Sequence, residues 1–329
     1  MLKLEDFQAA KKRVDEVILP THLIHSEAFS EESGNDVYIK PENLQKTGAF
    51  KIRGAYNKIM KLDDEAKKRG LIASSAGNHA QGVAYAAKKL GVKATICMPA
   101  HTPLIKVDAT KAHGADVVLY GEAYDEAYEK AVELQKSEGY TFVHPFDDED
   151  VMEGQGTIAL EIMEELPDVD YILVPIGGGG LISGIACAAK QINPSVKIVG
   201  VEPEGAASAL AAVEDDQLVK LSEVSTIADG TAVKQIGETP FEYIKKYVDE
   251  YYRTLAMGIY NLQYAYDPSM IVIGGAISTR EELLDKVNEQ LDIIFSQLTH
   301  AHVRPNIKVC QFGNDANLIG ATYHYIQRH

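Results

Sequence analysis

The sequence predicts an α/β fold with parallel sheets that are covered by helices on both faces. Between residues 37 and 201, short apolar runs alternate with longer stretches whose apolar residues recur with a helical period. This alternation is typical of strand–helix–strand units. The expected strands are Val37–Ile39, Leu71–Ala73, Ala94–Met98, Val117–Leu119, Tyr171–Ile176 and Lys197–Val201. The expected helices are Tyr56–Lys61, Ala80–Leu90, Leu104–His113, Tyr124–Ser137, Gly154–Glu165 and Leu181–Lys190.

The composition describes an acidic protein with enough apolar residues for a sizeable core. The chain has 329 residues, 46% of them hydrophobic, and this size favours two lobes. The net charge of -16 disfavours nucleic-acid binding, because an acidic surface repels phosphate groups. The three cysteines lie far apart without a Cys-x-x-Cys pair and indicate neither a disulfide framework nor a zinc site. No signal-peptide pattern and no membrane-spanning apolar run is present. We therefore expect a cytoplasmic protein without nucleic-acid or membrane partners.

A run of four glycines, Gly177, Gly178, Gly179 and Gly180, lies between a predicted strand and a predicted helix. Glycines allow a tight turn that exposes several N–H groups, and the helix N-terminus adds positive potential, so this turn suits an anion such as a phosphate. The turn does not match a dinucleotide fingerprint, because Ser183 stands where the third glycine of that motif should be. It does not match a Walker loop either, because the lysine of that motif does not follow. The alternative is a flexible tight turn.

The segment Ser74–His79 also follows a predicted strand and opens a helix. Its hydroxyl, amide and N–H groups suit a carboxylate. Simple helix capping by Ser75 or Asn78 explains the same residues about equally well. His79 taken alone is more often a packed histidine than a catalyst.

Lys51 lies at a predicted loop-to-helix junction, between Phe50 and Ile52. Apolar neighbours desolvate an amine, which lowers its pKa and makes it nucleophilic, as a Schiff-base lysine requires. This signal is weak by itself, because most lysines lie on solvated helix surfaces.

Together these segments resemble the pyridoxal-phosphate (PLP) enzymes of the threonine/serine dehydratase kind. Pro41–Ala55 resembles the PLP-lysine motif of threonine dehydratases and serine racemases, and the order and spacing of further matches fit over roughly residues 1–250. The further matches are Ser75–Gly82, Gly154–Thr157, Gly177–Gly180 and Thr226–Gly230. The resemblance implies a two-lobed PLP fold of type II, similar to tryptophan synthase β, with parallel or mixed sheets. The implied domains are a large one (residues 1–45 and 151–250) and a small one (46–150), with PLP between them.

The resemblance also implies residue roles and a reaction. By this resemblance, Lys51 forms the Schiff base with PLP and moves the Cα proton, and Phe50 and Asn78 contact the cofactor ring. The phosphate is held by Gly177, Gly178, Gly179 and Gly180. The substrate carboxylate is surrounded by Ser75, Asn78 and His79. The implied enzyme is an L-threonine/L-serine dehydratase, a homo-oligomer in amino-acid metabolism such as isoleucine biosynthesis. It converts a small amino acid into a 2-oxo acid and ammonia.

Three details bear on this expectation. Serine racemases carry a second serine where this chain has Ala76, and alanine has no exchangeable proton, so the dehydratase is favoured. The sequence does not choose between threonine and serine as the substrate, since one methyl group in an apolar pocket changes the binding free energy by only about 1–3 kcal/mol. Some relatives bind a cation near a Glu-Pro pair; Glu202-Pro203 matches, but Ser208 replaces the usual acid, so we expect no metal.

The last part of the chain, residues 251–329, resembles instead the C-terminal end of ROK-type sugar kinases. The matching stretches are Leu255–Leu262, Met270–Ser278 and Phe312–Ala321. The pattern predicts a helix, one buried strand, a second helix and a final strand–helix. The phosphate loop and the zinc cysteines of those kinases are missing. We expect a fusion whose dehydratase part lacks its last strands; Met270–Ile273 is a candidate for a vacant strand position. A non-catalytic or impaired hybrid is the alternative function.

Overall fold

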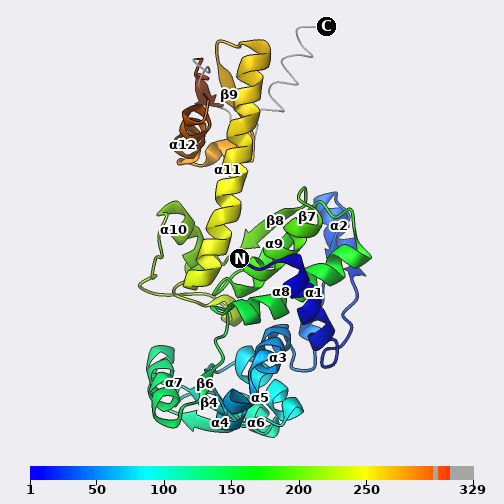
Figure 1. The fold of residues 1–329 in the computed structure, drawn as a ribbon, viewed down its shortest axis with the longest axis vertical. Coiled ribbons are helices and arrows are strands. Elements are labelled where there is room, and N and C mark those ends of the chain that lie inside the picture. The colour runs from blue at the N-terminus through cyan, green and yellow to red at the C-terminus, as the bar shows by residue number, and fades with distance from the viewer. Residues whose placement is uncertain (299–302, 312–329) are drawn as a thin grey trace. The chain divides into compact units, whose positions relative to one another are not determined.

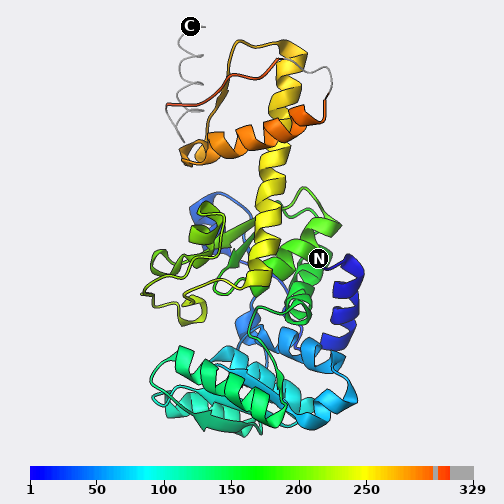
Figure 2. The same cartoon turned by 60° about the vertical axis from the view of Figure 1, so that its left-hand side comes forward.

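The computed structural model describes residues 1–298 and 303–311, and the chain divides into two compact units. The first unit is Met1–Ile244, and the second begins at Lys245. Figures 1 and 2 show the elements of both units. The expected final helix and the segment Phe312–Ala321 lie outside the described residues.

The first unit alternates strands and helices, as predicted. In chain order it contains α1 (Leu4–Val14), β1 (Ile24–His25), α2 (Glu27–Ser33), β2 (Tyr38–Ile39), α3 (Lys51–Lys61), α4 (Asp64–Arg69), β3 (Leu71–Ser74), α5 (Asn78–Leu90), β4 (Ala94–Met98), α6 (Leu104–Ala112), β5 (Asp116–Leu119), α7 (Tyr124–Glu138), β6 (Thr141–Phe142), α8 (Glu149–Glu165), β7 (Tyr171–Pro175), α9 (Gly180–Ile192), β8 (Lys197–Val201), α10 (Ser208–Glu214) and the start of α11 (Glu238–Tyr266). All the strands and helices predicted up to residue 201 are present, although α3 and α8 begin several residues earlier than expected. The sequence analysis missed α1, β1, α2, α4, β6 and α10.

Strands β5, β4, β3 and β6 form a parallel sheet in that order. Alternate residues of β3 face opposite sides: Leu71 and Ala73 pack in the core that includes α5, whereas Ile72 packs with Ala131 of α7. Helices therefore cover both faces, as predicted; Figure 1 shows α7 on one side of the sheet and α5 and α6 on the other. Because β3 and β6 are parallel neighbours, the loops that follow them leave the sheet at the same edge.

Helix α8 packs closely against both α3 and α9, and glycines make this approach feasible. A Cβ atom on Gly154 would lie 2.5 Å from the main-chain oxygen of Arg53, and one on Gly184 would lie 2.3 Å from that of Met152. Gly156 faces Gly184 in the same contact. The glycines of the Gly154–Thr157 motif therefore have a packing role.

The remaining strands of the first unit form two small sheets. β7 and β8 are parallel, which agrees with the expected parallel sheets, and β1 and β2 form a separate antiparallel pair. Ile172 and Val174 of β7 are buried, whereas Leu173 is 66% exposed. The division of residues 1–250 into a large and a small domain stays a prediction.

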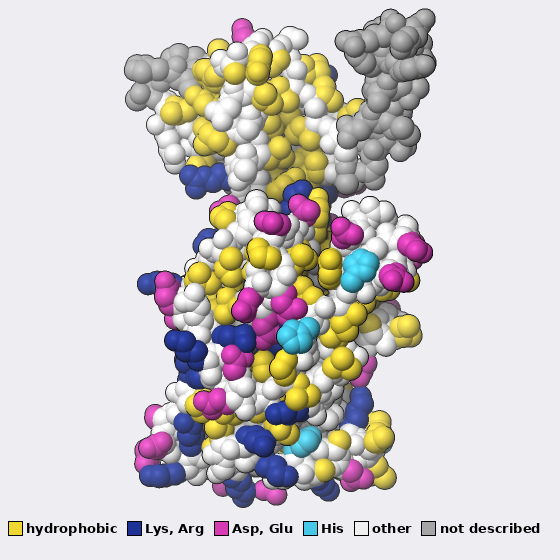
Figure 3. Space-filling view, turned by 90° about the vertical axis from the view of Figure 1, so that its right-hand side faces the viewer, with side chains coloured by type: hydrophobic (Ala, Val, Ile, Leu, Met, Phe, Trp, Pro, Cys, Tyr) yellow, Lys and Arg dark blue, Asp and Glu magenta, His cyan; other side chains and the backbone are white. Residues whose placement is uncertain are grey.

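The second unit has its own hydrophobic core. It contains the rest of α11, then β9 (Ile271–Ile273), α12 (Leu283–Ser296) and β10 (Ile307–Val309). Ala256 and Ile259 of α11 pack against Leu291 and Ile294 of α12. Figure 3 shows a wide hydrophobic area on the second unit.

Two expectations for the tail are corrected. The strand predicted as buried is β9, and its Val272 is 54% exposed. Met270–Ile273 was a candidate for a vacant strand position in the dehydratase part, but in the described residues β9 pairs in parallel with β10, a strand of its own unit. The expected order of helix, strand, helix and strand is confirmed.

Candidate active site

Lys51 is the first residue of α3, as expected for a lysine at a loop-to-helix junction. Its Nζ atom donates a hydrogen bond to the main-chain oxygen of Pro145 at 2.6 Å and lies 5.3 Å from the centre of the Phe50 ring. Burial lowers the pKa of Lys51 to about 8. The amine is therefore closer to its neutral, nucleophilic form than a solvated lysine.

The glycine turn, Gly177–Gly180, connects β7 to α9. Gly179 has a φ of 89°, a conformation that favours glycine, and is the N-cap residue of α9. Among the described residues, no acceptor pairs with the N–H groups of Gly177, Gly178 and Gly179. These N–H groups at a helix N-terminus remain available to an anion.

A short segment connects Lys51 to the glycine turn. Pro145 accepts the hydrogen bond from Lys51, and the next residue, Phe146, packs on the turn. A Cβ atom on Gly178 would lie 2.1 Å from Cδ1 of Phe146, and one on Gly180 would lie 2.7 Å from its main-chain oxygen. The amine and the turn thus contact consecutive residues, although 126 positions separate Lys51 from Gly177 in the sequence (177 minus 51).

The predicted carboxylate loop leaves the same sheet edge, after β3. Ser75 Oγ accepts a hydrogen bond from the N–H of Gly77 at 3.2 Å, and Asn78 is exposed as the first residue of α5. The N-cap of α5 is Gly77 and no side chain caps it, so the capping alternative is wrong. Within α5, Gly82 packs against the backbone of Lys51, where a Cβ atom would lie 3.1 Å from the carbonyl carbon. This contact brings the loop's helix beside the lysine.

His79 is buried and paired with the backbone. Its Nε2 atom lies 2.9 Å from the oxygen of Val143, so Nε2 carries the proton and donates it, and Nδ1 has no partner among the described residues. Burial, followed by the positive charge of Lys51, lowers the pKa of His79 to about 3. The imidazole is therefore neutral at physiological pH.

The sequence analysis missed the segment His144–Asp147 because the strand before it, β6, has only two residues. The carboxylates of the acidic run Asp147–Asp150 have hydrogen-bond or ion-pair partners. Asp147 accepts hydrogen bonds from the N–H groups of Glu238 and Thr239 at 3.0 and 2.9 Å. The sequence signal that could have found the segment His144–Asp147 is its position directly after a strand of a parallel sheet, where ligand sites are common.

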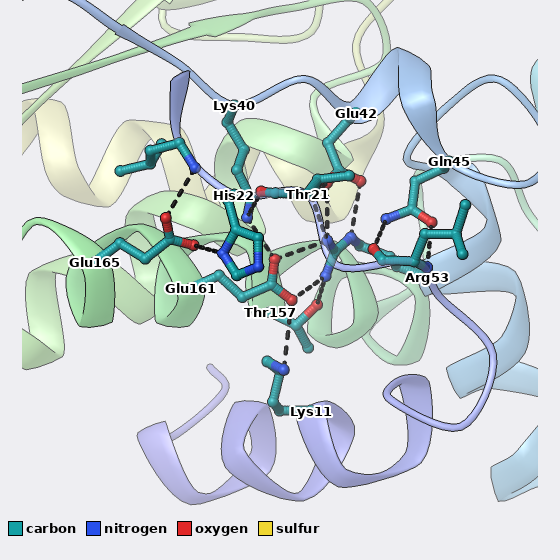
Figure 4. A network of polar contacts seen from close by, with 12 residues as sticks. Lys11, Thr21, His22, Lys40, Glu42, Gln45, Arg53, Thr157, Glu161 and Glu165 are labelled. Atoms are coloured by element: carbon teal, nitrogen blue, oxygen red, sulfur yellow. Dashed lines mark hydrogen bonds and ion pairs between the residues drawn. The ribbon is translucent and has the colours of Figure 1, made fainter. Parts of the chain in front are cut away.

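A buried ionic network holds α3 in place behind Lys51 (Figure 4). The fully buried Arg53 guanidinium forms paired hydrogen bonds of 2.7–2.9 Å with Glu161 and Glu42, and also contacts Thr157. Burial would raise the pKa of Glu161, but the hydrogen bonds and charges of Arg53 and Lys40 outweigh it and lower the pKa to about 2. The sequence analysis gave Arg53 no such role.

The matching Glu-Pro pair is used differently from a metal ligand. Both carboxylate oxygens of Glu202 accept hydrogen bonds of 2.9 Å, from the N–H groups of Ala209 and Leu210 at the start of α10. Glu202 therefore caps a helix in this structure.

A desolvated lysine and a glycine turn with available N–H groups, both in contact with the segment Pro145–Phe146, fit PLP, whose aldehyde requires an amine and whose phosphate requires hydrogen-bond donors. The chain belongs to the pyridoxal-phosphate dependent enzyme family, whose model matches residues 14–262. The ROK family model matches residues 226–328. The two matches confirm the predicted combination of a dehydratase-like part with a ROK-like C-terminal segment.

Particular relatives are named L-threonine ammonia-lyase or L-threonine dehydratase. The L-threonine ammonia-lyase of Thermotoga maritima is 52% identical over 250 residues, which are 76% of this chain and 62% of that protein. The catabolic L-threonine dehydratase TdcB of Staphylococcus aureus is 48% identical over 252 residues, which are 76% of this chain and 73% of that protein. The chain thus spans less than two thirds of the length of the Thermotoga relative.

Solved structures agree with the fold. The processed form of threonine deaminase isoform 2 from Solanum lycopersicum has a TM-score of 0.72 and 36% identity, with 97% of this chain and 87% of that chain covered. Maize serine racemase has a TM-score of 0.73 and 29% identity, with 99% of this chain and 98% of that chain covered.

In the described residues, none of the helices is both long and apolar enough to cross a membrane.

Proposed function

We propose that the chain is a PLP-dependent L-threonine/L-serine ammonia-lyase, which converts its substrate into a 2-oxo acid and ammonia. The observation that carries this proposal is the segment Pro145–Phe146, which contacts both the Lys51 amine and the glycine turn. The names of the relatives support the choice of reaction.

Lys51 has two roles in this proposal: it would hold the cofactor covalently, and, once the amino group of the substrate has displaced it, its freed amine would take the proton from Cα of the amino acid. When bound, PLP supplies an electron-withdrawing ring that stabilises negative charge at that carbon. The lowered pKa of Lys51, about 8, supports both roles, because a useful fraction of the amine is neutral near pH 7.

The glycine turn would hold the phosphate through the N–H groups of Gly177, Gly178, Gly179 and Gly180. Three of these groups have no acceptor in the described part of the chain, and the N-terminus of α9 favours negative charge. Phe50, beside the Lys51 amine, and Asn78, exposed at the start of α5, would contact the cofactor ring.

The substrate carboxylate would lie on the loop between β3 and α5. The Ser75 hydroxyl accepts from Gly77, so its own proton is available for donation, and the Asn78 amide is exposed. His79 would contribute its main-chain N–H, because its imidazole proton is already donated to Val143 and an unprotonated Nδ1 cannot donate.

A second candidate function is PLP binding without turnover, in a hybrid whose dehydratase part is incomplete. The family match ends at residue 262, and the Thermotoga relative extends well beyond the aligned part. This supports a site that lacks some of its surroundings.

The test is to saturate the purified protein with PLP and record the visible absorption of lysine-bound cofactor. We expect this band in the natural chain and not in Lys51→Ala, together with release of 2-oxobutanoate from L-threonine or pyruvate from L-serine. A band without product would select the hybrid. No band at saturating PLP would remove both functions.

The same proposal includes a cytoplasmic location, assembly as a homo-oligomer and a role in isoleucine biosynthesis. It also includes the division into a large domain (residues 1–45 and 151–250) and a small domain (46–150), with the cofactor between them. The resemblance to threonine dehydratases supports these statements.

A further inference from the structure

The segment His144–Asp147, which we name the bridging segment, contacts three parts of the proposed site. Pro145 accepts the hydrogen bond of Lys51, Phe146 packs on the glycine turn, and Asp147 accepts from the start of α11. The main chain of Gly237 also donates to the oxygen of Gly178 at 3.1 Å. A small change in this segment would therefore alter the spacing between the lysine and the turn.

His144 connects the two ends of the bridging segment through one atom. Its Nδ1 accepts hydrogen bonds from the N–H of Asp147 at 2.8 Å and from the N–H of Phe146 at 3.4 Å. A nitrogen that accepts cannot carry a proton, so the imidazole proton lies on Nε2. The ring also packs edge-on against Phe146, with centroids 4.8 Å apart, and at 6.0 Å from the Phe142 ring.

The groups around His144 agree with this neutral form. Burial lowers the pKa of His144, the carboxylates of Asp147 and Asp148 raise it, and the Lys51 amine lowers it, with a net lowering. His79 faces His144 across the same region and is itself neutral, since its own pKa is lowered. An added proton on Nδ1 would point at two N–H groups and break both hydrogen bonds.

We propose that His144 is a positioning residue, whose Nδ1 atom fixes the bridging segment so that Pro145 meets the Lys51 amine and Phe146 meets the glycine turn. His144 acts through these neighbours. The inference rests on the proposed PLP site, and it gives a specific task to an imidazole that the reaction itself does not use.

Two matched variants separate the acceptor from the ring. In His144→Asn, the amide oxygen takes the place of Nδ1 and can accept the same two N–H groups, whereas His144→Phe keeps an aromatic ring and loses the acceptor. We expect His144→Phe to raise the PLP concentration for half-maximal lysine-bound absorption by about tenfold or more, as the loss of two partly buried hydrogen bonds predicts. His144→Asn should stay within about threefold of the natural chain, by the same reasoning.

Hydrogen exchange gives a readout that does not depend on the cofactor. In the PLP-free protein, the Asp147 amide should exchange about tenfold faster in His144→Phe than in the natural chain, and at a nearly unchanged rate in His144→Asn. Equal PLP binding and equal exchange in the natural chain and in His144→Phe would overturn the proposal. So would equal losses in both variants, because the ring and not the acceptor would then matter.

A measurement on the natural chain covers the case in which a variant fails to fold. Nitrogen NMR of labelled histidine distinguishes the tautomers, and we expect His144 to carry its proton on Nε2; a proton on Nδ1 would overturn the proposal. If the natural chain shows no lysine-bound PLP, the proposed function fails. The exchange and tautomer results then still decide whether His144 holds the segment.

Discussion

The Nζ atom of Lys51 donates to the main-chain oxygen of Pro145, 94 residues later in the chain, at 2.6 Å. This contact joins the start of α3 to the segment after β6. Since the next residue, Phe146, packs on Gly178 and Gly180, one short segment contacts both the lysine amine and the turn that we propose to bind the phosphate. The predictions below test this arrangement and the buried network that supports it.

The first prediction concerns the pH dependence of the Lys51 amine. Because burial lowers its pKa to about 8, the neutral fraction should rise as the pH increases through 8 and level off above it. The measurement is borohydride trapping of PLP at fixed concentration, with the modified peptide quantified by mass spectrometry. A midpoint near 10.5, the ordinary value for lysine, would show that the amine is solvated.

The second prediction concerns the tight contact at Gly178. Gly178→Ala places a Cβ atom against the Phe146 ring, so we expect a loss of about 1–3 kcal/mol in the free energy of unfolding. We also expect PLP binding to weaken by about tenfold or more, because the turn that would hold the phosphate must move to make room for the Cβ atom. Denaturant unfolding and PLP titration measure the two effects.

Gly258→Ala is the matched control. Gly258 is exposed within α11, where a Cβ atom meets nothing within 4 Å, so alanine should stabilise the helix by up to about 1 kcal/mol. If Gly178→Ala behaves like this control, the Phe146 contact with the turn is not as tight as described.

The third prediction concerns Arg53. Arg53→Met leaves the carboxylates of Glu42 and Glu161 with fewer partners in a buried site, which should cost about 3–5 kcal/mol in the free energy of unfolding. Lys12→Met is the control, because Lys12 is exposed on α1 and such changes usually stay within about 0.5 kcal/mol. Similar urea midpoints for the two variants would contradict the role given to Arg53.

The fourth prediction is an acid limb that depends on Glu161. Its pKa is lowered from 4.5 to about 2 in the folded chain, so the unfolded chain binds more protons between these values. The stabilisation is present above pH 4.5 and is lost as the pH falls towards 2, a change of about 3 kcal/mol. Glu161→Gln should be less stable at neutral pH and show a flatter acid limb. An unchanged slope of unfolding free energy against pH would count against this assignment.

Most of the fold was predictable from sequence because the elements that form it are long or strongly apolar. The strand Ala94–Met98 is a short apolar run whose five residues are all buried, the helix Tyr124–Glu138 shows a helical period, and both were found with small errors. The strand Thr141–Phe142 was missed because two residues cannot show a period, and the site segment after it was missed with it. The exposure of Val272 was missed because an apolar run does not reveal which surface remains uncovered.

The candidate site was only partly predictable. The glycine turn was found because four consecutive glycines are visible in one dimension, whereas Lys51, whose local signal is weak, was singled out by the resemblance of Pro41–Ala55 to the PLP-lysine motif. The pairing of His79 with Val143, and the contacts of Pro145 and Arg53, depend on neighbours across helices and strands. No local pattern encodes such contacts.

A crystal structure of the natural chain grown with PLP is the most direct test of the central claim. We predict density continuous from Lys51 Nζ to the cofactor, with the phosphate accepting hydrogen bonds from the N–H groups of Gly177–Gly180. Cofactor bonded to a different lysine, or a phosphate bound away from this turn, would contradict the account.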